Sequence, residues 1–401
     1  MKFKDILGYI SDEELDFLSA ETKVNHQVKK LNGSMVFKLI LFSLLEHGKP
    51  SLRVMEEIFH SSSFRFFTNT DSLTTKYNSL SDRLSSINSD YFCEIFHLLF
   101  EKFNAELGEQ NALQKYDSTM VAISSKLVDW GMKVGHKTNK KQLKVTVGLH
   151  GSLPCDFKIF TENKHNCEDL TIPEVILDYR HNKASVVTFD RGVQKRTTFV
   201  KFDEQDILFV TRIKTNATHH VIRNIEIKES KKETDSLIIL EDLEVNFNEW
   251  ETKKRIFTSF RLIKAVTKKS NEKIYFVSNN FELEAGEIAN LYRQRWEIEV
   301  FFRFIKQQLN FSQLVNRNLN GVKVMIYMTL ILASMIIIYK KKNNLKGFKI
   351  VKMKIVNELQ NELIKEIVIM SGGDVAKISQ SSKIGYFIWI YIYTIFNPFM
   401  I

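Results

Sequence analysis

The pattern of apolar and polar positions predicts helices at the start of the chain. Apolar residues recur at helical spacing through roughly the first hundred positions. Ser11 and Glu14 form a capping box, in which each side chain hydrogen-bonds the other residue's backbone and starts a helix. Further helices are predicted over 35–45, from Ser51 and from Ser79. This part is typical of a small helical module, and its helix-turn-helix signal is weak.

The pattern changes to strands after about residue 111. Short apolar runs between polar turns predict strands over 115–123, 142–150, 156–161, 185–190 and 206–214, with a helix over 169–179. Alternating stretches at 236–240, 255–260 and 273–277 then predict a mostly β insertion. One long helix is predicted over 284–310, and the remainder of the chain is helical with basic interruptions.

This order of elements predicts an α/β fold flanked by helical regions. We divide it into a helical N-terminal region at 1–105, an α/β domain at 106–318 and a helical C-terminal region at 319–401. The β insertion lies within the middle domain, at about 215–280. Because no linker-like stretch rich in Ser, Gly or Pro occurs, the boundaries are expected in short polar turns.

Two apolar runs raise the alternative of a membrane protein. Residues 324–339 and 384–396 are almost uninterruptedly apolar, but both are shorter than the roughly 20 residues that a spanning helix needs. A buried helix explains the first run equally well, even with Lys340 to Lys342 as a basic flank. We therefore expect no membrane partner. The first residues lack an export-type apolar segment, which predicts a cytoplasmic location.

The charge balance favours a polyanionic partner. The chain has 57 Lys and Arg against 47 Asp and Glu, a net charge of +10. Nucleic acid is the first candidate for such a protein, and a solvated basic surface is the alternative. The three cysteines form no C-x-x-C pair, so the pattern gives no support to a zinc or redox site.

The segment 291–306 places unusual chemistry on one side of a predicted helix. At about 100° per residue, Tyr292, Arg295, Glu299 and Lys306 fall within one narrow stripe. A carboxylate flanked by a phenol and two cations can bind a metal while the cations hold phosphate oxygens. The alternative is an ordinary amphipathic helix with an Arg295–Glu299 salt bridge, which periodicity alone favours.

These residues also resemble a known family. The spacing Tyr-x2-Arg-x3-Glu-x6-Lys of Tyr292, Arg295, Glu299 and Lys306 resembles the YREK signature of DDE transposases in the insertion-sequence-four family. Upstream, Lys115-Tyr-Asp-Ser-Thr119 and Thr188-Phe-Asp-Arg-Gly192 resemble the segments that carry the family's two aspartates. These aspartates are Asp117 and Asp190. One departure concerns the family's Lys-x-His-Asp element, where Asn166 replaces the usual acid.

The resemblance implies a ribonuclease-H-like catalytic core whose Asp117, Asp190 and Glu299 hold two Mg²⁺ ions, with Mn²⁺ as the usual substitute. Carboxylates are the ligands that such hard cations prefer. Tyr292, Arg295 and Lys306 would then contact DNA phosphates.

The implied function is cut-and-paste transposition of an insertion sequence. The partners would be double-stranded DNA, as terminal inverted repeats and target, and a second copy of the chain in a homodimer. The location would be the bacterial cytoplasm, at the nucleoid. By analogy, the N-terminal region would bind DNA ends and the C-terminal region would make dimer contacts.

Two other functions remain open: a transposase-derived DNA-binding protein that no longer cuts, and a ribonuclease-H-like nuclease. In some relatives an aromatic side chain accepts a flipped base. Trp250 and Trp296 are candidates for that role, although we expect both in the core.

Overall fold

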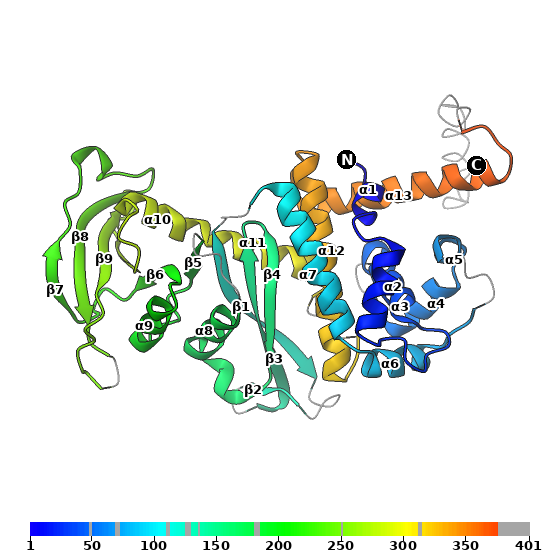
Figure 1. Ribbon diagram of the computed structural model, residues 1–401, viewed down its shortest axis with the longest axis horizontal. Helices are drawn as coiled ribbons and strands as arrows, with labels where there is room; N and C mark the ends of the chain where they lie inside the picture. The colour runs from blue at the N-terminus through cyan, green and yellow to red at the C-terminus, as the bar shows by residue number, and fades with distance from the viewer. Residues whose placement is uncertain are drawn as a thin grey trace, which may run out of the picture.

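The computed structural model describes residues 1–375 apart from 48–49, 69–72, 110–112, 125–129, 135–136, 180–184, 250–251 and 312–314. The molecule is elongated, with strands β7 to β9 at one end and a group of helices at the other (Figure 1). The second predicted apolar run, at 384–396, lies outside the described residues.

The first part of the chain is helical, as predicted. Its helices are α1 (Phe3–Leu7), α2 (Asp12–Glu21), α3 (Gly33–Glu46), α4 (Leu52–His60), α5 (Ser62–Thr68), α6 (Tyr77–Ser86) and α7 (Asp90–Leu107). The capping box at the start of α2 is confirmed, because the Ser11 amide donates to Glu14 at 3.0 Å and the Glu14 amide donates to Ser11 Oγ at 3.1 Å. Ser51 caps α4 in a similar way, through a 3.3 Å bond from the amide of Val54.

The middle of the chain forms one mixed sheet with helices against it. Its elements are β1 (Gln114–Ser124), β2 (Met132–Val134), β3 (Lys137–His150), β4 (Leu153–Phe160), α8 (Glu168–Asp178), β5 (Val186–Phe189), α9 (Arg196–Glu204) and β6 (Leu208–Ile213). A short 3₁₀ helix, η1, spans Asn163–Asn166. Strands β1, β5 and β6 are parallel neighbours, whereas β3 pairs antiparallel with both β1 and β4. The predicted α/β class is therefore confirmed.

The predicted β insertion continues this sheet. Its elements are β7 (His219–Asn224), η2 (Glu229–Lys231), β8 (Leu237–Phe247), β9 (Phe260–Thr267) and β10 (Lys273–Ser278). Strand β10 pairs with β6, and the order then runs β10-β9-β8-β7. The strand predicted over 255–260 is wrong, because β9 begins only at Phe260 and Phe257 is 84% exposed. Among the described residues, the Phe257 side chain packs against no second layer, so the alternating pattern of 255–260 does not correspond to a buried face.

The long helix predicted over 284–310 is interrupted. It consists of α10 (Ala285–Gln294) and α11 (Trp296–Gln308), which meet at Arg295. The Arg295 amide donates to the Tyr292 carbonyl at 3.0 Å, and the Ile298 amide donates to the Arg295 carbonyl at 3.0 Å. These i to i+3 bonds tighten the turn relative to an α-helix. Both helices nevertheless follow one another past β5 and β1 (Figure 1).

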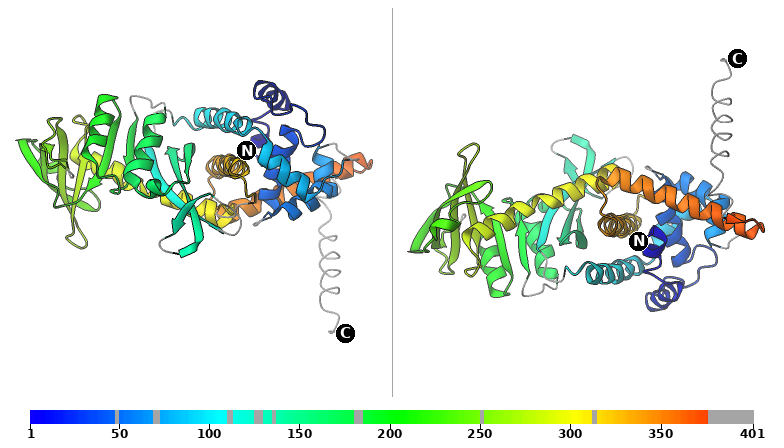
Figure 2. Two further views of the ribbon diagram at one scale, coloured as in Figure 1. Left: turned by 90° about the horizontal axis from the view of Figure 1, so that it is seen from below. Right: turned by 90° about the horizontal axis from the view of Figure 1, so that it is seen from above.

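The first apolar run lies in α12 (Leu319–Lys342), which is followed by α13 (Phe348–Met370). By length and composition α12 could cross a membrane, with a mean hydropathy of 2.2, but 89% of its apolar window is buried inside the molecule. It packs against α3, α6, α7 and α13, and Figure 2 shows it end-on beside the N-terminal helices. Protein therefore already covers the surface that a bilayer would contact.

The largest hydrophobic core joins regions that are far apart in the sequence. It includes Phe92 and Phe96 of α7, Val145 of β3, Ile305 of α11 and Met335 of α12. The face of α11 predicted to be apolar is buried there, with Ile298, Phe301 and Phe302 exposed by 0%, 4% and 6%. Burial of this face fixes which side of the helix can reach the sheet.

Candidate functional site

The two predicted aspartates lie on neighbouring parallel strands. Asp117 is on β1, and Asp190 directly follows β5. The strand register pairs Tyr116 with Phe189, the residues immediately before the two aspartates. Pairing of these strands thus brings two carboxyl groups to one place, although they are 73 residues apart in the sequence.

Arg295 connects Asp117 to the third predicted carboxylate. Its Nη1 lies 3.3 Å from Oδ2 of Asp117, and its Nη2 lies 2.6 Å from Oε1 of Glu299. The Arg295 and Asp117 side chains are only 11% and 16% exposed, so solvent weakens their interaction little. Arg295 Nε is buried and has no hydrogen-bond partner in the part of the chain that the structure describes. The Arg295–Glu299 salt bridge expected for an ordinary amphipathic helix is present. The same guanidinium also contacts Asp117, so it connects the helix to strand β1.

Tyr292 and Lys306 complete the predicted stripe. The Tyr292 hydroxyl donates to Oδ1 of Asp190 at 3.4 Å, and the Arg295 guanidinium lies 5.7 Å from the Tyr292 ring centre. The Lys306 side chain as a whole is exposed. Partial burial of its amine lowers the pKa of Lys306, whereas the nearby Asp117 raises it. All six predicted site residues therefore contact, or lie electrostatically close to, one another.

Negative charge accumulates at Asp117. Burial, with a smaller contribution from the nearby carboxylates of Glu168 and Asp190, raises the pKa of Asp117 to about 6. The Ser118 amide, which donates to Oδ1 at 2.7 Å, and the Arg295 guanidinium act in the opposite direction. The hydrogen bonds and the single guanidinium do not fully offset the cost of ionising this buried group.

The donor chemistry of this site fits a hard divalent cation. Asp117, Asp190 and Glu299 are carboxylates, and such cations prefer oxygen ligands. Within the described residues, however, no group of three or more Asp, Glu, His or Cys side chains is gathered closely enough to hold an ion. Arg295 lies between Asp117 and Glu299 and provides the positive charge in this arrangement. The metal roles of Asp117, Asp190 and Glu299 therefore stay predictions.

The structure also corrects some expectations about the surface. Trp296 is 55% exposed, so its expected place in the core is wrong; it begins α11, where its neighbours Ile298 and Phe301 fill the buried face instead. Trp250 lies outside the described residues. The basic run at 340–342 is partly neutralised, because Lys341 and Lys342 form ion pairs with Glu109 and Glu106.

Glu168, the first residue of α8, is an acidic residue near this site that the sequence pattern did not indicate. Its carboxylate lies near Asp190, Lys144 and Arg295, whose charges all influence its pKa. An acidic residue directly before Asp169, close to the Lys-x-His element already noted, was the available signal. Periodicity could not show that this helix start faces the strand ends.

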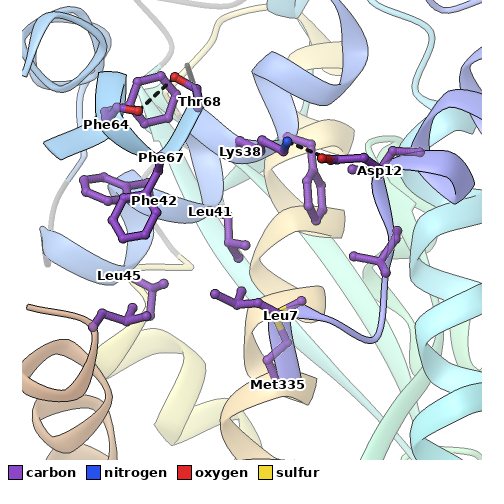
Figure 3. Close-up of a pocket in the computed structure, with 14 residues that line it drawn as sticks. Leu7, Asp12, Lys38, Leu41, Phe42, Leu45, Phe64, Phe67, Thr68 and Met335 are labelled. Carbon is purple, nitrogen blue, oxygen red and sulfur yellow. Dashed lines mark hydrogen bonds and ion pairs between the residues drawn. The ribbon is translucent and has the colours of Figure 1, made fainter. Parts of the chain in front are cut away.

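An apolar pocket occurs well away from these residues. It has a volume of about 190 Å³ and lies among the helices, between α1, α2, α3, α5, α12 and α13. Figure 3 shows Leu41, Phe42, Phe67 and Met335 lining it, with the 2.7 Å ion pair of Lys38 and Asp12 beside them. None of the six predicted site residues lines this pocket.

Comparison with known proteins agrees with the motif residues. The family model described as "Transposase DDE domain" matches residues 115–336, which is more than half of the chain. The match includes β1, β5, α10 and α11, the elements that carry the residues described above. The chain belongs to the DDE transposase family.

Three curated relatives are distant in sequence. The chain is 28% identical over 253 residues to the "Probable transposase for insertion sequence element IS5377" of Geobacillus stearothermophilus, covering 61% of this chain and 62% of the relative. It is 29% identical over 251 residues to the "Putative transposase for insertion sequence element IS4SA" of Synechocystis sp., covering 61% and 65%. It is 25% identical over 256 residues to the "Putative transposase y4zB" of Sinorhizobium fredii, covering 63% and 68%. The aligned part thus spans about two thirds of each relative.

Proposed function

We propose that this protein is a DNA transposase that excises and inserts an insertion sequence by metal-dependent hydrolysis and strand transfer at the ends of the element. The observation that carries the proposal is the contact of Arg295 with both Asp117 and Glu299, next to the Tyr292–Asp190 hydrogen bond. Residues on one helical stripe thereby contact Asp117 and Asp190, and the chain belongs to the DDE transposase family. The mixed sheet with parallel β1, β5 and β6 supports a ribonuclease-H-like core.

In this proposal Asp117, Asp190 and Glu299 hold two Mg²⁺ ions, and Mn²⁺ can replace them. When bound, the ions activate the attacking oxygen and stabilise the leaving oxygen of the phosphodiester. Asp117 must be ionised to act as a ligand. With a pKa of about 6 it is mostly ionised at neutral pH, and metal binding would displace the remaining proton.

Arg295, Tyr292 and Lys306 would bind the DNA phosphates beside the reacting bond. The Arg295 guanidinium has five donors, and a phosphate can accept two of them in parallel. The buried Arg295 Nε has no hydrogen-bond partner among the described residues, so it is available to a phosphate oxygen if the side chain turns toward DNA. The exposed Trp296, next in sequence, is available to stack on an unpaired base.

The remaining predictions belong to this proposal. The DNA substrates would be the terminal inverted repeats and a target, and two copies of the chain would act together because both ends must be processed in one complex. The net charge of +10 favours association with DNA and a place at the bacterial nucleoid in the cytoplasm. The alternative of a transposase-derived protein that binds DNA without cutting predicts binding alone.

The test uses DNA duplexes carrying the inverted repeats that flank the gene. Wild-type protein in Mg²⁺ should nick the repeat ends, and Glu299→Gln should reduce the rate at least about a thousandfold while DNA binding remains. Glu241→Gln is the matched control, since Glu241 is a surface residue of β8 that pairs with Lys264. DNA binding without cutting by wild type would support the binding-protein alternative, and equal cutting by wild type and Glu299→Gln would overturn the proposed site.

A further inference from the structure

A second ion pair connects the start of α11 to β1. The Lys115 amine lies 2.9 Å from Oε2 of Glu297, the second residue of α11. The Lys115 side chain is only 2% exposed, whereas that of Glu297 is 58% exposed. Lys115 also donates to the carbonyl of Gly151, in the turn between β3 and β4, at 2.6 Å. A buried cation is thus fixed against the sheet and reaches a carboxylate on the helix.

This ion pair lies beside the contact of Arg295 with Asp117. Lys115 and Asp117 are two positions apart on β1, so their side chains point to the same face of the sheet. Their partners, Glu297 and Arg295, are two positions apart at the start of α11. The strand supplies first a cation and then an acid, and the helix supplies the opposite charge to each. Exchanged partners would bring two cations together and two acids together, so the charges allow only this pairing.

The two ion pairs hold α11 from different sides. Successive residues of a helix point about 100° apart, so Arg295 and Glu297 leave the helix about 200° apart. Rolling the helix about its axis in either direction would therefore lengthen one of the two contacts. Glu299 lies two residues beyond Glu297 on the same helix, so the direction of its carboxylate depends on that rotation.

We infer that Lys115 and Glu297 are positioning residues, whose ion pair fixes the rotation of α11 and thereby the direction of the Glu299 carboxylate. The inference rests on the proposed function, in which Glu299 acts at the reacting phosphodiester. Lys115 and Glu297 act through the helix, because their charged groups contact each other. Reacting groups must be held to within about 0.5 Å, so a helix that rolls loses rate before it loses DNA affinity.

The competing explanation is that this ion pair only stabilises the fold. Removing Glu297 alone leaves a buried ammonium without its counterion, which is destabilising whatever the role of the pair. Replacing both members by neutral side chains avoids that cost, because methionine fills the volume of the lysine chain and needs no charged partner. The double variant Lys115→Met/Glu297→Gln therefore separates positioning from stability.

The experiment compares this double variant with Lys158→Met/Glu174→Gln in the full chain. Lys158 of β4 and Glu174 of α8 form another strand-to-helix ion pair, with 2.8 Å between the amine and Oε1. Urea unfolding measures the stability of each protein. Hydrogen–deuterium exchange of the amides at 295–301, in EDTA and without DNA, measures how firmly the start of α11 is held. Single-turnover nicking of the inverted-repeat duplex in Mg²⁺ gives the rate at saturating DNA, and fluorescence anisotropy gives the DNA affinity.

Lys115→Met/Glu297→Gln should unfold at a urea concentration close to that of wild type. Its amides at 295–301 should nevertheless exchange faster, and it should nick DNA about tenfold or more slowly with unchanged DNA affinity. The control variant should match wild type in exchange and in rate. Glu297→Asp, which retains the charge on a shorter side chain, should nick at a rate between those of wild type and Glu297→Gln. These two single variants serve if the double variant does not fold.

Wild-type exchange and rate in Lys115→Met/Glu297→Gln, with slow nicking by Glu299→Gln, would overturn this inference and leave the proposed function intact. Equal losses in the two double variants would also overturn it, because they would reflect the loss of any strand-to-helix ion pair. Absence of nicking by the wild type would overturn the proposed function instead. The exchange measurement, which needs neither metal nor DNA, would then decide alone whether the pair fixes α11.

Discussion

The guanidinium of Arg295 donates a 2.6 Å hydrogen bond to the carboxylate of Glu299, one helical turn further along the chain. Because α10 and α11 meet at Arg295, this bond crosses the junction between the two helices. The same guanidinium lies 3.3 Å from Asp117. It is therefore the counterion of a strand carboxylate and a helix carboxylate at the same time.

Replacing Arg295 by Gln should destabilise the metal-free protein. Asp117 would lose its nearest cation and remain buried, which costs about 1–3 kcal/mol in the free energy of unfolding for a group of this kind. Urea unfolding at pH 8 in EDTA measures the cost. The double variant Asp117→Asn/Arg295→Gln should recover part of it, because the unpaired charge is removed. Additive effects of the two substitutions would mean that the pair does not interact.

Stability should depend on pH through Asp117. Its pKa is raised from 3.8 to about 6 in the folded protein, so the folded state binds the proton more tightly than the unfolded state does. Stability from this group is therefore present at low pH and is lost as pH rises from about 4 through 6, by about 3 kcal/mol at most. Asp117→Asn should be more stable than wild type at pH 8 in EDTA, with a gain that shrinks toward pH 4.

A control for this pH effect is Asp156→Asn. Burial also raises the pKa of Asp156 to about 6, but that residue lies on β4 and is not among the proposed metal ligands. Both variants should show the pH-dependent gain, and Mg²⁺ should cancel only that of Asp117→Asn, because the ion stabilises the wild-type carboxylate. A gain of constant size at every pH would show that ionisation is not its cause.

Gly192→Ala should be destabilising because the new methyl group meets Glu168. Overpacking of this kind typically costs about 1–3 kcal/mol. Combining it with Glu168→Ala, which removes the opposing carboxylate, should recover most of the loss in a double-mutant cycle measured by urea unfolding. If Gly192→Ala costs the same with and without Glu168, the close contact is not what requires the glycine.

The β extension should depend on one buried ion pair. Arg261 of β9 donates from Nε and Nη2 to Asp242 of β8 at 2.9 and 2.6 Å, and the two side chains are 4% and 2% exposed. Arg261→Ala leaves a buried carboxylate unpaired and should cost about 3–5 kcal/mol. Lys264→Ala removes the cation that pairs with the exposed Glu241, also between β9 and β8. This change should cost less than about 1 kcal/mol. Thermal unfolding followed by circular dichroism compares the two, and similar losses would contradict the distinction.

The sequence by itself determined the elements and the residues to examine. Apolar spacing located β1, β5 and the helices, because an element that buries one face repeats its apolar residues with its own period. It also placed Tyr292, Arg295 and Glu299 on one stripe, since their relative positions depend only on helix geometry. The continuation of β10 from β6 and the late start of β9 at Phe260 did not follow, because strand pairing and exposure depend on distant partners.

Only the tertiary structure decided which carboxylates meet. The proximity of Asp117 to Asp190 comes from parallel pairing of β1 with β5, and that of Glu168 comes from the hydrogen bonds between Asp169 and the loop after β5. The buried place of α12 likewise depends on helices that cover it from both ends of the sequence. Local patterns describe one element at a time, whereas burial, charge and contact distance arise only when separate elements pack together.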